Sequence, residues 1–564
     1  MTRWFRHWIF LLVLLPIGVQ AGGGPLNTLV VVNSANRNSR ALGAFYAEQH
    51  GIPPSHLCTI KVNSRSPTIS LEAFERDVRA PILQHIAKQD LTGQIHYLVL
   101  CMDTPTRVNS DNGITSALFY GYKAKAPDAP RCNIAPDSDN QYFAAEMAYT
   151  ATAGWNRTNT PIAFILTAAD MKTAKHVVRR GSEAQASHPK SVYVLGGSGD
   201  GARNIRHHTY SAVARQLSLL GRRDMLVTDA AASPVPEQPV IGYLTGLAYF
   251  PSNFNELVFA PGAIADHVTS CGGMLPDPCY NQSSVWDWLR LGATASYGTV
   301  FEPCAYQKKF PDPMIAFWYS RGFTAGEALA MSVHNPYQGI WVGDPLAAPF
   351  ATPPAVEIRS PTRNMHLDGD ITLSLALSSH PDGAPPVYLD LYLDGRHHTP
   401  IARPLAPVGN EVSVQIGPDR YSYTIAPGED LFAATAGLAW AINTQSRGKV
   451  IANAKADRME LSTAAPLDDE GNPLPLSVSA EQGFAPALYI GITAGTTNLV
   501  MDGQTGRAAV ALHLGSARSY ELEYPFDLSG LSPGAHTLTL VVRDGTAVQC
   551  QSQATLPFII PPRR

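Results

Sequence analysis

Four side chains capable of chemistry stand close together in the sequence. Asp266, His267, Ser270 and Cys271 follow an apolar run that begins at Leu257. In an open α/β sheet, ligands bind beyond the carboxyl ends of the strands, which is where this run places the four residues. A thiolate activated by an imidazole is an efficient nucleophile for acyl transfer. The pattern indicates either a cysteine hydrolase that uses Cys271 and His267, or a pocket without catalysis.

The cysteines suggest a structural alternative to a catalytic role for Cys271. The chain has seven cysteines, an odd number, so at least one has no partner within the chain. Cys271 and Cys279 flank a proline-containing loop, and Cys304 follows the next predicted strand, so a disulfide among these three is plausible. A bonded Cys271 could not be a nucleophile. A disulfide, or a buried thiol beside a histidine bonded to the backbone, is the more common outcome.

Other polar residues are expected at the same edge of the sheet. Asp103 ends one apolar run, and Tyr243 lies in another that covers residues 240–246. Two carboxylates at a sheet edge could bind a cation or act as acid and base. Asp170 also ends a strand, but it directly precedes a helical pattern and is interpreted as a helix cap. We predict catalytic roles for Cys271 and His267, no metal, no cofactor, and a pocket lined by Asp103, Asp266, Ser270 and Tyr243.

A glycine-rich segment, residues 196–201, follows a predicted strand. A backbone of this kind can hold phosphate when a helix starts directly after it. This segment lacks the lysine and hydroxyl residue of a phosphate loop, and the next helical pattern starts only near Tyr210. We interpret it as a flexible turn.

The elements that position these residues alternate along the chain. Continuous apolar runs at residues 29–32, 95–101, 162–166, 192–195, 225–228 and 240–244 alternate with amphipathic helical patterns such as those at 39–50, 70–88 and 210–220. Alternation of this kind predicts an α/β domain, here residues 22–352, with a mostly parallel sheet and helices on both faces. Residues 292–300 read as a further strand, and residues 341–346 as a tight turn that closes the domain.

The pattern changes after residue 352. Residues 371–377 and 387–393 alternate between apolar and polar side chains, and Asp394-Gly395 predicts a hairpin turn. We predict a β-sandwich in two pieces, residues 353–404 and 486–564. Residues 405–485 form an inserted small α+β module in which Asp430 is a helix N-cap.

The N-terminus and the composition suggest where the protein acts. Residues 1–21 carry two arginines, an apolar core and a small-residue end, the layout of a cleavable secretory signal. Only 16% of residues are charged and the net charge is −4, which excludes a nucleic-acid partner and gives no field for an anionic membrane. We expect a secreted or periplasmic protein without a membrane span after cleavage, whose partner is an extracellular polymer or protein.

Several motifs resemble those of an uncharacterised family of exported bacterial proteins. They lie at residues 261–270, 288–294, 298–303 and 343–346, with Asn33-Ser34 near the start, and the likeness covers roughly residues 27–350. This resemblance implies no known activity.

A more distant resemblance is to gingipain-type cysteine peptidases of the caspase-like fold. It puts residues 270–273 at the position of the cysteine and residues 240–246 at the strand that carries the histidine. Tyr243 or Thr245 stands where the histidine is expected, and neither is a base at neutral pH. The resemblance therefore implies the fold more than the activity. Residues 531–538, followed by Asp544-Gly545, resemble the end of bacterial immunoglobulin-like domains.

Together these observations predict an exported protein with a cell-envelope or extracellular role and a pocket in its α/β domain. The alternatives are a gingipain-like cysteine hydrolase and a surface adhesion or polysaccharide-binding protein. In the last case residues 353–564 alone would bind the partner.

Overall fold

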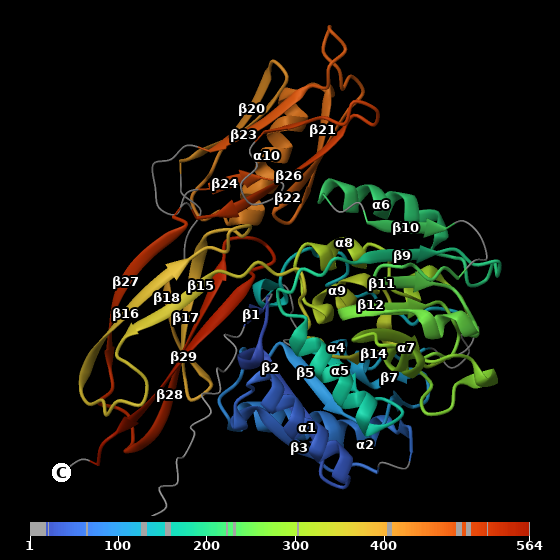
Figure 1. Ribbon diagram of the computed structural model, residues 1–564, viewed down its shortest axis with the longest axis vertical. Helices are drawn as coiled ribbons and strands as arrows, with labels where there is room; N and C mark the ends of the chain where they lie inside the picture. Colours follow the sequence, from blue (N-terminus) through green and yellow to red (C-terminus); the bar gives the residue numbers. More distant parts are fainter. Residues whose placement is uncertain are drawn as a thin grey trace, which may run out of the picture.

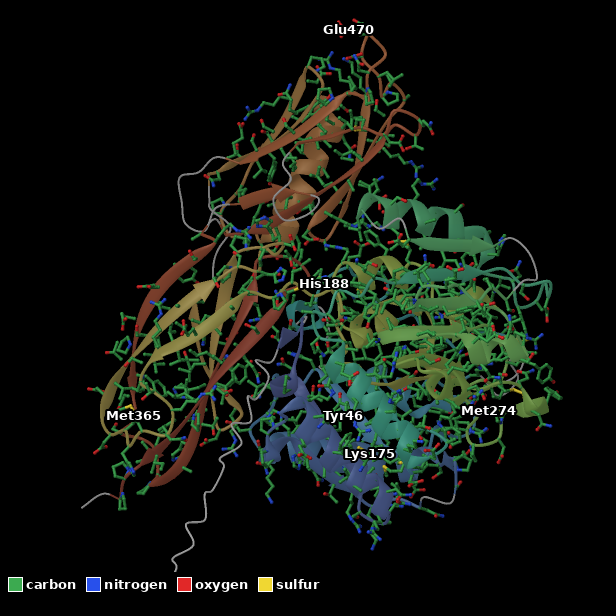
Figure 2. All side chains as sticks on the ribbon, in the orientation of Figure 1. Tyr46, Lys175, His188, Met274, Met365 and Glu470 are labelled. Carbon is green, nitrogen blue, oxygen red and sulfur yellow. A yellow bond between two sulfur atoms is a disulfide. The ribbon has the colours of Figure 1, made fainter. Side chains whose placement is uncertain are left out.

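The computed structural model describes residues 19–20, 22–63, 66–125, 132–152, 160–221, 224–228, 233–301, 304–402, 409–480, 488–491, 498–515 and 517–562. The predicted signal segment, residues 1–21, lies outside these residues apart from strand β1 (Val19–Gln20), which pairs with the last strand, β29 (Gln551–Ile560). Figure 1 shows three parts: an α/β domain, a sandwich beside it and a small module above both. Tyr46 lies in the first, Met365 in the second and Glu470 at the tip of the third (Figure 2).

The α/β domain is built on a ten-stranded sheet, and most of its strands are buried apolar runs. Strands β3, β2, β5 and β8 are parallel to one another, as are β10, β9, β11, β12 and β13, so the predicted mostly parallel sheet is confirmed. The spatial order is β10 (Met225–Thr228), β9 (Val192–Gly196), β11 (Val240–Thr245), β12 (Phe259–His267), β13 (Ala295–Thr299), β14 (Gly339–Gly343), β8 (Ile162–Leu166), β5 (Tyr97–Cys101), β2 (Thr28–Asn33) and β3 (Leu57–Ile60).

Strand β14 differs from the expectation for its residues, since residues 341–343 are strand and only the residues after them turn. It runs antiparallel to β13. Its first residue, Gly339, pairs with Thr299 and lies against Gly113, beyond the carboxyl end of β5. Asp344 follows the last residue of β14. Its carboxylate is hydrogen-bonded to Nε2 of His50, at the carboxyl end of the first helix. These contacts place the carboxyl ends of β5 and β13 along one edge of the sheet.

Two rows of helices cover the sheet. One row contains α1 (Arg37–His50), α5 (Met171–Glu183) and α7 (Val285–Leu291), and the other contains α4 (Ile114–Tyr120), α9 (Ala325–Ser332), α8 (Ile315–Ser320) and α6 (Tyr210–Leu219). Helix α2 (Leu71–Phe74) continues through a π-helical turn (Glu75–Arg79) into α3 (Ala80–Lys88), which packs on β3. As predicted, Asp170 caps α5, because its carboxylate accepts from the backbone N–H of Thr173. A small extra sheet contains β4 (Thr68–Ile69), β6 (Arg107–Val108) and β7 (Asn112–Gly113).

The sandwich combines a three-stranded and a five-stranded antiparallel sheet around a leucine-rich core. Apart from β1, its strands come from two distant pieces of the chain. They are β15 (Ala355–Ser360), β16 (Asp370–Ser378), β17 (Pro386–Leu393), β18 (Arg396–Ala402), β27 (Ser519–Asp527), β28 (Gly534–Asp544) and β29 (Gln551–Ile560).

The inserted module packs one helix, α10 (Leu431–Gln445), against two four-stranded antiparallel sheets. Asp430 caps α10, as expected, by accepting from the N–H of Ala433. The module includes strands that the sequence placed in the sandwich, because β26 pairs with β22. Its strands are β19 (Glu411–Ile416), β20 (Asp419–Thr424), β21 (Val450–Lys455), β22 (Arg458–Thr463), β23 (Pro475–Ala480), β24 (Leu488–Gly491), β25 (Asn498–Val500) and β26 (Arg507–Leu514).

A buried ion cluster fastens the module to the α/β domain. Arg458, at the start of β22, donates to the carboxylate of Glu146 from Nε at 2.5 Å and from Nη2 at 2.7 Å. Arg321, after α8, donates to Glu146 at 3.1 Å and to Asp457 at 2.5 Å. The backbone N–H of Ala547, from the sandwich, donates to the same Asp457 at 2.8 Å. All three parts of the molecule therefore meet at this cluster.

In the part of the chain that the structure describes, none of the helices has the length and hydrophobicity of a transmembrane span.

Candidate functional site

The segment that follows β12 carries most of the predicted site residues. The hydroxyl of Thr299, at the end of β13, donates to the carbonyl oxygens of Thr269 at 2.9 Å and Ser270 at 2.6 Å. The hydroxyl of Thr269 donates to the buried amide oxygen of Gln282 at 2.6 Å. These bonds hold residues 267–271 beside the loop of residues 277–283.

Cys271 is bonded to Cys279 in a disulfide, one of the alternatives that the sequence left open. A second disulfide joins Cys132 to Cys304, and the remaining three cysteines, Cys58, Cys101 and Cys550, are buried thiols. A bonded sulfur carries no thiolate, so Cys271 cannot attack a substrate in this form of the protein. A catalytic role for the predicted pair would first require reduction of this bond.

His267 is held in one orientation and one protonation state. The indole N–H of Trp288 donates to Nδ1 at 2.9 Å, so Nδ1 has no proton. The ring proton therefore lies on Nε2, which donates to the carbonyl oxygen of Ser283 at 3.0 Å. Burial lowers the pKa of His267 to about 4, since the charged form would lose its hydration. With both nitrogens engaged, His267 serves as a neutral structural link.

Asp266 is engaged in a buried ion pair. Arg206 donates to its carboxylate at 2.5 Å and to the carbonyl oxygens of Thr245 at 2.7 Å and Pro311 at 2.9 Å. Both side chains are only 1% exposed. Burial raises the pKa of Asp266, and the Arg206 guanidinium opposes that rise. The pair ties the segment after β9 to the ends of β11 and β12 and leaves Asp266 inaccessible to a ligand.

Two further predicted residues lie elsewhere. Tyr243 is buried among the rings of Phe254 and Trp288, and its hydroxyl donates to the carbonyl oxygen of Pro234. Asp103 follows β5, which is four strand positions away from β12 in the sheet. At about 4.8 Å for each step, that separation is roughly 19 Å. The expectation of one pocket shared by Asp103 and Asp266 is therefore not met, because strand order, which local sequence does not show, puts them apart.

Ser270 does line a hollow. It has a volume of about 200 Å³, less than the ~300–1,000 Å³ that encloses a drug-sized molecule, so it fits a small group of a larger ligand. The walls come from the segments after β9, β12 and β13. The lining residues are Ala202, Arg203, Val268, Thr269, Ser270, Cys304, Ala305, Lys309 and Phe310.

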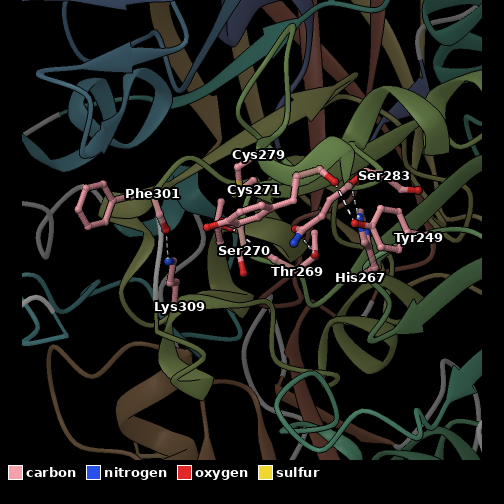
Figure 3. Close-up of a disulfide and its surroundings, with 12 residues drawn as sticks. Tyr249, His267, Thr269, Ser270, Cys271, Cys279, Ser283, Phe301 and Lys309 are labelled. Carbon is pink, nitrogen blue, oxygen red and sulfur yellow. Dashed lines mark hydrogen bonds between the residues drawn. A yellow bond between two sulfur atoms is a disulfide. The ribbon is translucent and has the colours of Figure 1, made fainter.

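Two cations face this hollow and none of its described lining residues is acidic. Arg203 is paired with Asp200 on its outer side, while its Nε is buried and has no hydrogen-bond partner among the described residues. Lys309 is fully buried, and its ammonium donates to the carbonyl oxygen of Phe301 at 2.6 Å (Figure 3). Guanidinium and ammonium groups in the wall of a hollow favour a ligand that carries a negative charge.

Arg203 lies two residues after the glycine-rich segment, and Gly246, the residue after β11, allows its position. A Cβ built on Gly246 would lie 2.0 Å from the carbonyl oxygen of Arg203, so the two backbones approach this closely only without a side chain at 246. Sequence reasoning missed Arg203, Arg206 and Lys309. The glycine-rich segment that follows β9 is the sequence signal that could have indicated Arg203.

The structure describes no group of three or more histidine, cysteine, aspartate or glutamate side chains that could hold a metal ion in the residues that it covers.

A titration of His267 tests this view of the site. In an NMR experiment its ring is expected to remain neutral, with the proton on Nε2, until the pH falls to about 4, against the ordinary value of about 6.5. The unfolded chain binds the proton below about 6.5, so the stability contributed by neutral His267 is lost as the pH falls from about 6.5 to about 4, by about 3 kcal/mol. His267→Gln should flatten the fall in unfolding free energy over that range. A midpoint near 6.5 would contradict the assignment.

Comparison with known proteins adds little. No protein-family model matches the chain. No curated protein matches it either. Among solved structures, dimeric latent PorU from Porphyromonas gingivalis is similar at 8% identity and a TM-score of 0.21, over 95% of this chain and 54% of PorU. This chain thus spans about half the length of PorU.

Fibronectin(III)-like modules of CbhA from Clostridium thermocellum are similar at 11% identity and a TM-score of 0.07, over 37% of this chain and 94% of theirs. Neither likeness is strong enough to carry an argument. The family resemblances seen in the sequence stay predictions.

Proposed function

We propose that this is an exported protein that binds an anionic group of an extracellular ligand in the hollow beyond β12, without chemical change to that group. The observation that carries the proposal is the pair of cations, Arg203 and Lys309, in the wall of a hollow that has no acidic residue among its described lining. Charge-assisted hydrogen bonds from such groups to a carboxylate, sulfate or phosphate are about twice as strong as neutral ones.

The state of the nearby reactive groups supports binding over catalysis. Cys304 lines the hollow and Cys271 follows its wall, and both sulfurs are in disulfides. His267, which the sequence suggested as a base, already uses both ring nitrogens. Export is supported by the N-terminal pattern and by the two disulfides, which form and persist in oxidising compartments.

An NMR titration of the full chain with sodium sulfate, and separately with sodium acetate, tests the binding site. The Nε–H resonance of Arg203 is expected to shift and saturate, because that group is buried beside the hollow and has no hydrogen-bond partner in the described part of the chain. Arg363, an exposed arginine between β15 and β16, is the internal control and should show only the small shift of a solvated guanidinium.

A variant links the shift to the geometry. Gly246→Ala should abolish saturation at Arg203, since the added methyl group displaces the carbonyl oxygen of residue 203. If Arg203 and Arg363 respond alike to both salts, the hollow is not an anion site and the proposal fails.

A further inference from the structure

An exposed pair of aromatic rings lies beside the hollow. Tyr280 is 75% exposed and Tyr249 is 58% exposed, although large apolar rings are usually at least partly covered. The hydroxyl of Tyr249 donates to the backbone carbonyl oxygen of Tyr280 at 2.9 Å, so the two residues are held together at the surface. Both rings lie outside the hydrophobic core.

The Tyr280 loop is fixed in place by several bonds. Cys279, the preceding residue, is in the disulfide with Cys271, and Gln282 accepts from Thr269 in the wall of the hollow. Tyr280 itself has a φ of 56°, in the left-handed region that few non-glycine residues adopt. A ring presented to solvent from a fixed backbone loses little conformational freedom when it binds a partner.

The disulfide connects the wall of the hollow to the loop that carries Tyr280. In Figure 3, Tyr249 and His267 lie on one side of Cys271–Cys279, Lys309 lies on the other, and Ser270 lies next to Cys271. Chain connectivity agrees with the view, because Thr269 and Ser270 line the hollow and Cys271 is bonded to the neighbour of Tyr280. A ligand that reaches both must therefore present an anionic group and, next to it, a flat face that packs on tyrosine.

We infer that the ligand is an acidic polysaccharide, with the carboxylate of one sugar unit in the hollow and an adjacent pyranose ring packed on Tyr280 and Tyr249. This inference rests on the proposed anion site and names its ligand class. The C–H face of a pyranose is apolar and packs on an aromatic ring, while its hydroxyls bond to the phenol and to amides such as that of exposed Asn281. Arg203 and Lys309 complement the uronate charge.

A protein partner fits less well. A stable protein interface buries about 800 Å² on each side around an apolar core, and one pair of tyrosine rings falls far short of that core. The size of the hollow also suits one carboxylated substituent of a chain that continues outside it.

Calorimetric titration of the full chain with an oligogalacturonate tests the inference. Two matched ligands separate its parts: the methyl ester of the same oligosaccharide, which has the rings without the charge, and an oligoglutamate of equal length, which has the charge without the rings. The oligogalacturonate is expected to bind at least about tenfold more tightly than either, since it alone uses both surfaces.

Three variants assign the binding energy. Arg203→Ala should weaken oligogalacturonate binding about tenfold through loss of the charge contact. Tyr280→Asn should weaken it by a similar factor, and asparagine suits the left-handed backbone, so the loop keeps its shape. Trp440→Ala, which removes an exposed ring from α10 in the module, is the matched control and should leave affinity unchanged.

The outcomes distinguish this inference from the function on which it rests. Equal binding of oligoglutamate, lost in Arg203→Ala and unchanged in Tyr280→Asn, overturns the polysaccharide and leaves the anion site. Equal binding of the methyl ester, sensitive only to Tyr280→Asn, overturns the acidic part. An absence of binding by all three ligands, together with an Arg203 resonance that does not saturate with sulfate or acetate, overturns both proposals.

Discussion

Arg206→Met is expected to lower the free energy of unfolding of the α/β domain by about 3–5 kcal/mol, because it leaves the carboxylate of Asp266 buried without its partner. Chemical denaturation followed by tryptophan fluorescence measures the change. The double variant Arg206→Met, Asp266→Leu is the control. It removes both charges and should recover most of the loss, since an apolar pair of similar volume can replace a buried ion pair.

The pH dependence of the Arg206→Met variant gives a second readout. Burial already raises the pKa of Asp266, and removal of the guanidinium removes the main opposing influence. An unfolded chain loses the aspartate proton near pH 4 while the folded variant keeps it, so the variant should lose stability as the pH rises above about 4. If Arg206→Met lowers the free energy of unfolding by less than about 1 kcal/mol at neutral pH, the ion pair does not stabilise the domain as its geometry indicates.

Glu146→Gln is expected to destabilise the junction between the module and the α/β domain by about 3–5 kcal/mol. The side chain of Glu146 is 2% exposed and accepts hydrogen bonds from both Arg458 and Arg321. The substitution takes this buried carboxylate away from both arginines. Hydrogen exchange should speed up in the β21–β22 hairpin before it does in the central sheet. Glu411→Gln, which breaks the exposed pair with Arg420, is the matched control and should cost no more than about 1 kcal/mol.

Low pH should weaken the same junction between the module and the α/β domain. Burial opposes ionisation of Glu146, but the hydrogen bonds and charges of Arg458 and Arg321 hold its pKa below the usual value. A lowered carboxylate pKa contributes stability that is present above about pH 4.5 and is lost as the pH falls through the folded value. The difference between the protein and Glu146→Gln should therefore shrink below that pH. If hydrogen exchange in the hairpin is unchanged by the variant, the module is held by other contacts.

The sequence was sufficient for most of the elements and insufficient for the site. Apolar runs such as residues 162–166 match their strands because a strand covered on both faces needs apolar residues throughout. Residues 341–346 read as a turn in the sequence, where Gly343 and Pro345 stand close together, and only pairing with β13 makes residues 341–343 a strand. Strands β24 to β26 alternate like those of the sandwich, so local periodicity could not assign them to the module.

The site depends on contacts between residues far apart in the chain. The partner of Asp266 is Arg206, the partner of His267 is Trp288, and Lys309 reaches the hollow from the segment after β13. None of these pairings has a periodic signature. Cys271 with Cys279 was one of several disulfides that spacing allowed, and only geometry selects it.

The split sandwich sets an order of events during synthesis. Strand β16 pairs along its whole length with β27, from Ser378 with Ser519 to Asp370 with Asp527, and the inserted module occupies the sequence between them. A chain grows from its N-terminus, so the nascent polypeptide holds the leucines of β16 and β17 without their partners until the final strands have been made. Early folding of the intervening module brings those ends together and lowers the entropic cost of closure. A fragment truncated just before Ser519 should therefore be prone to aggregation and dependent on chaperones.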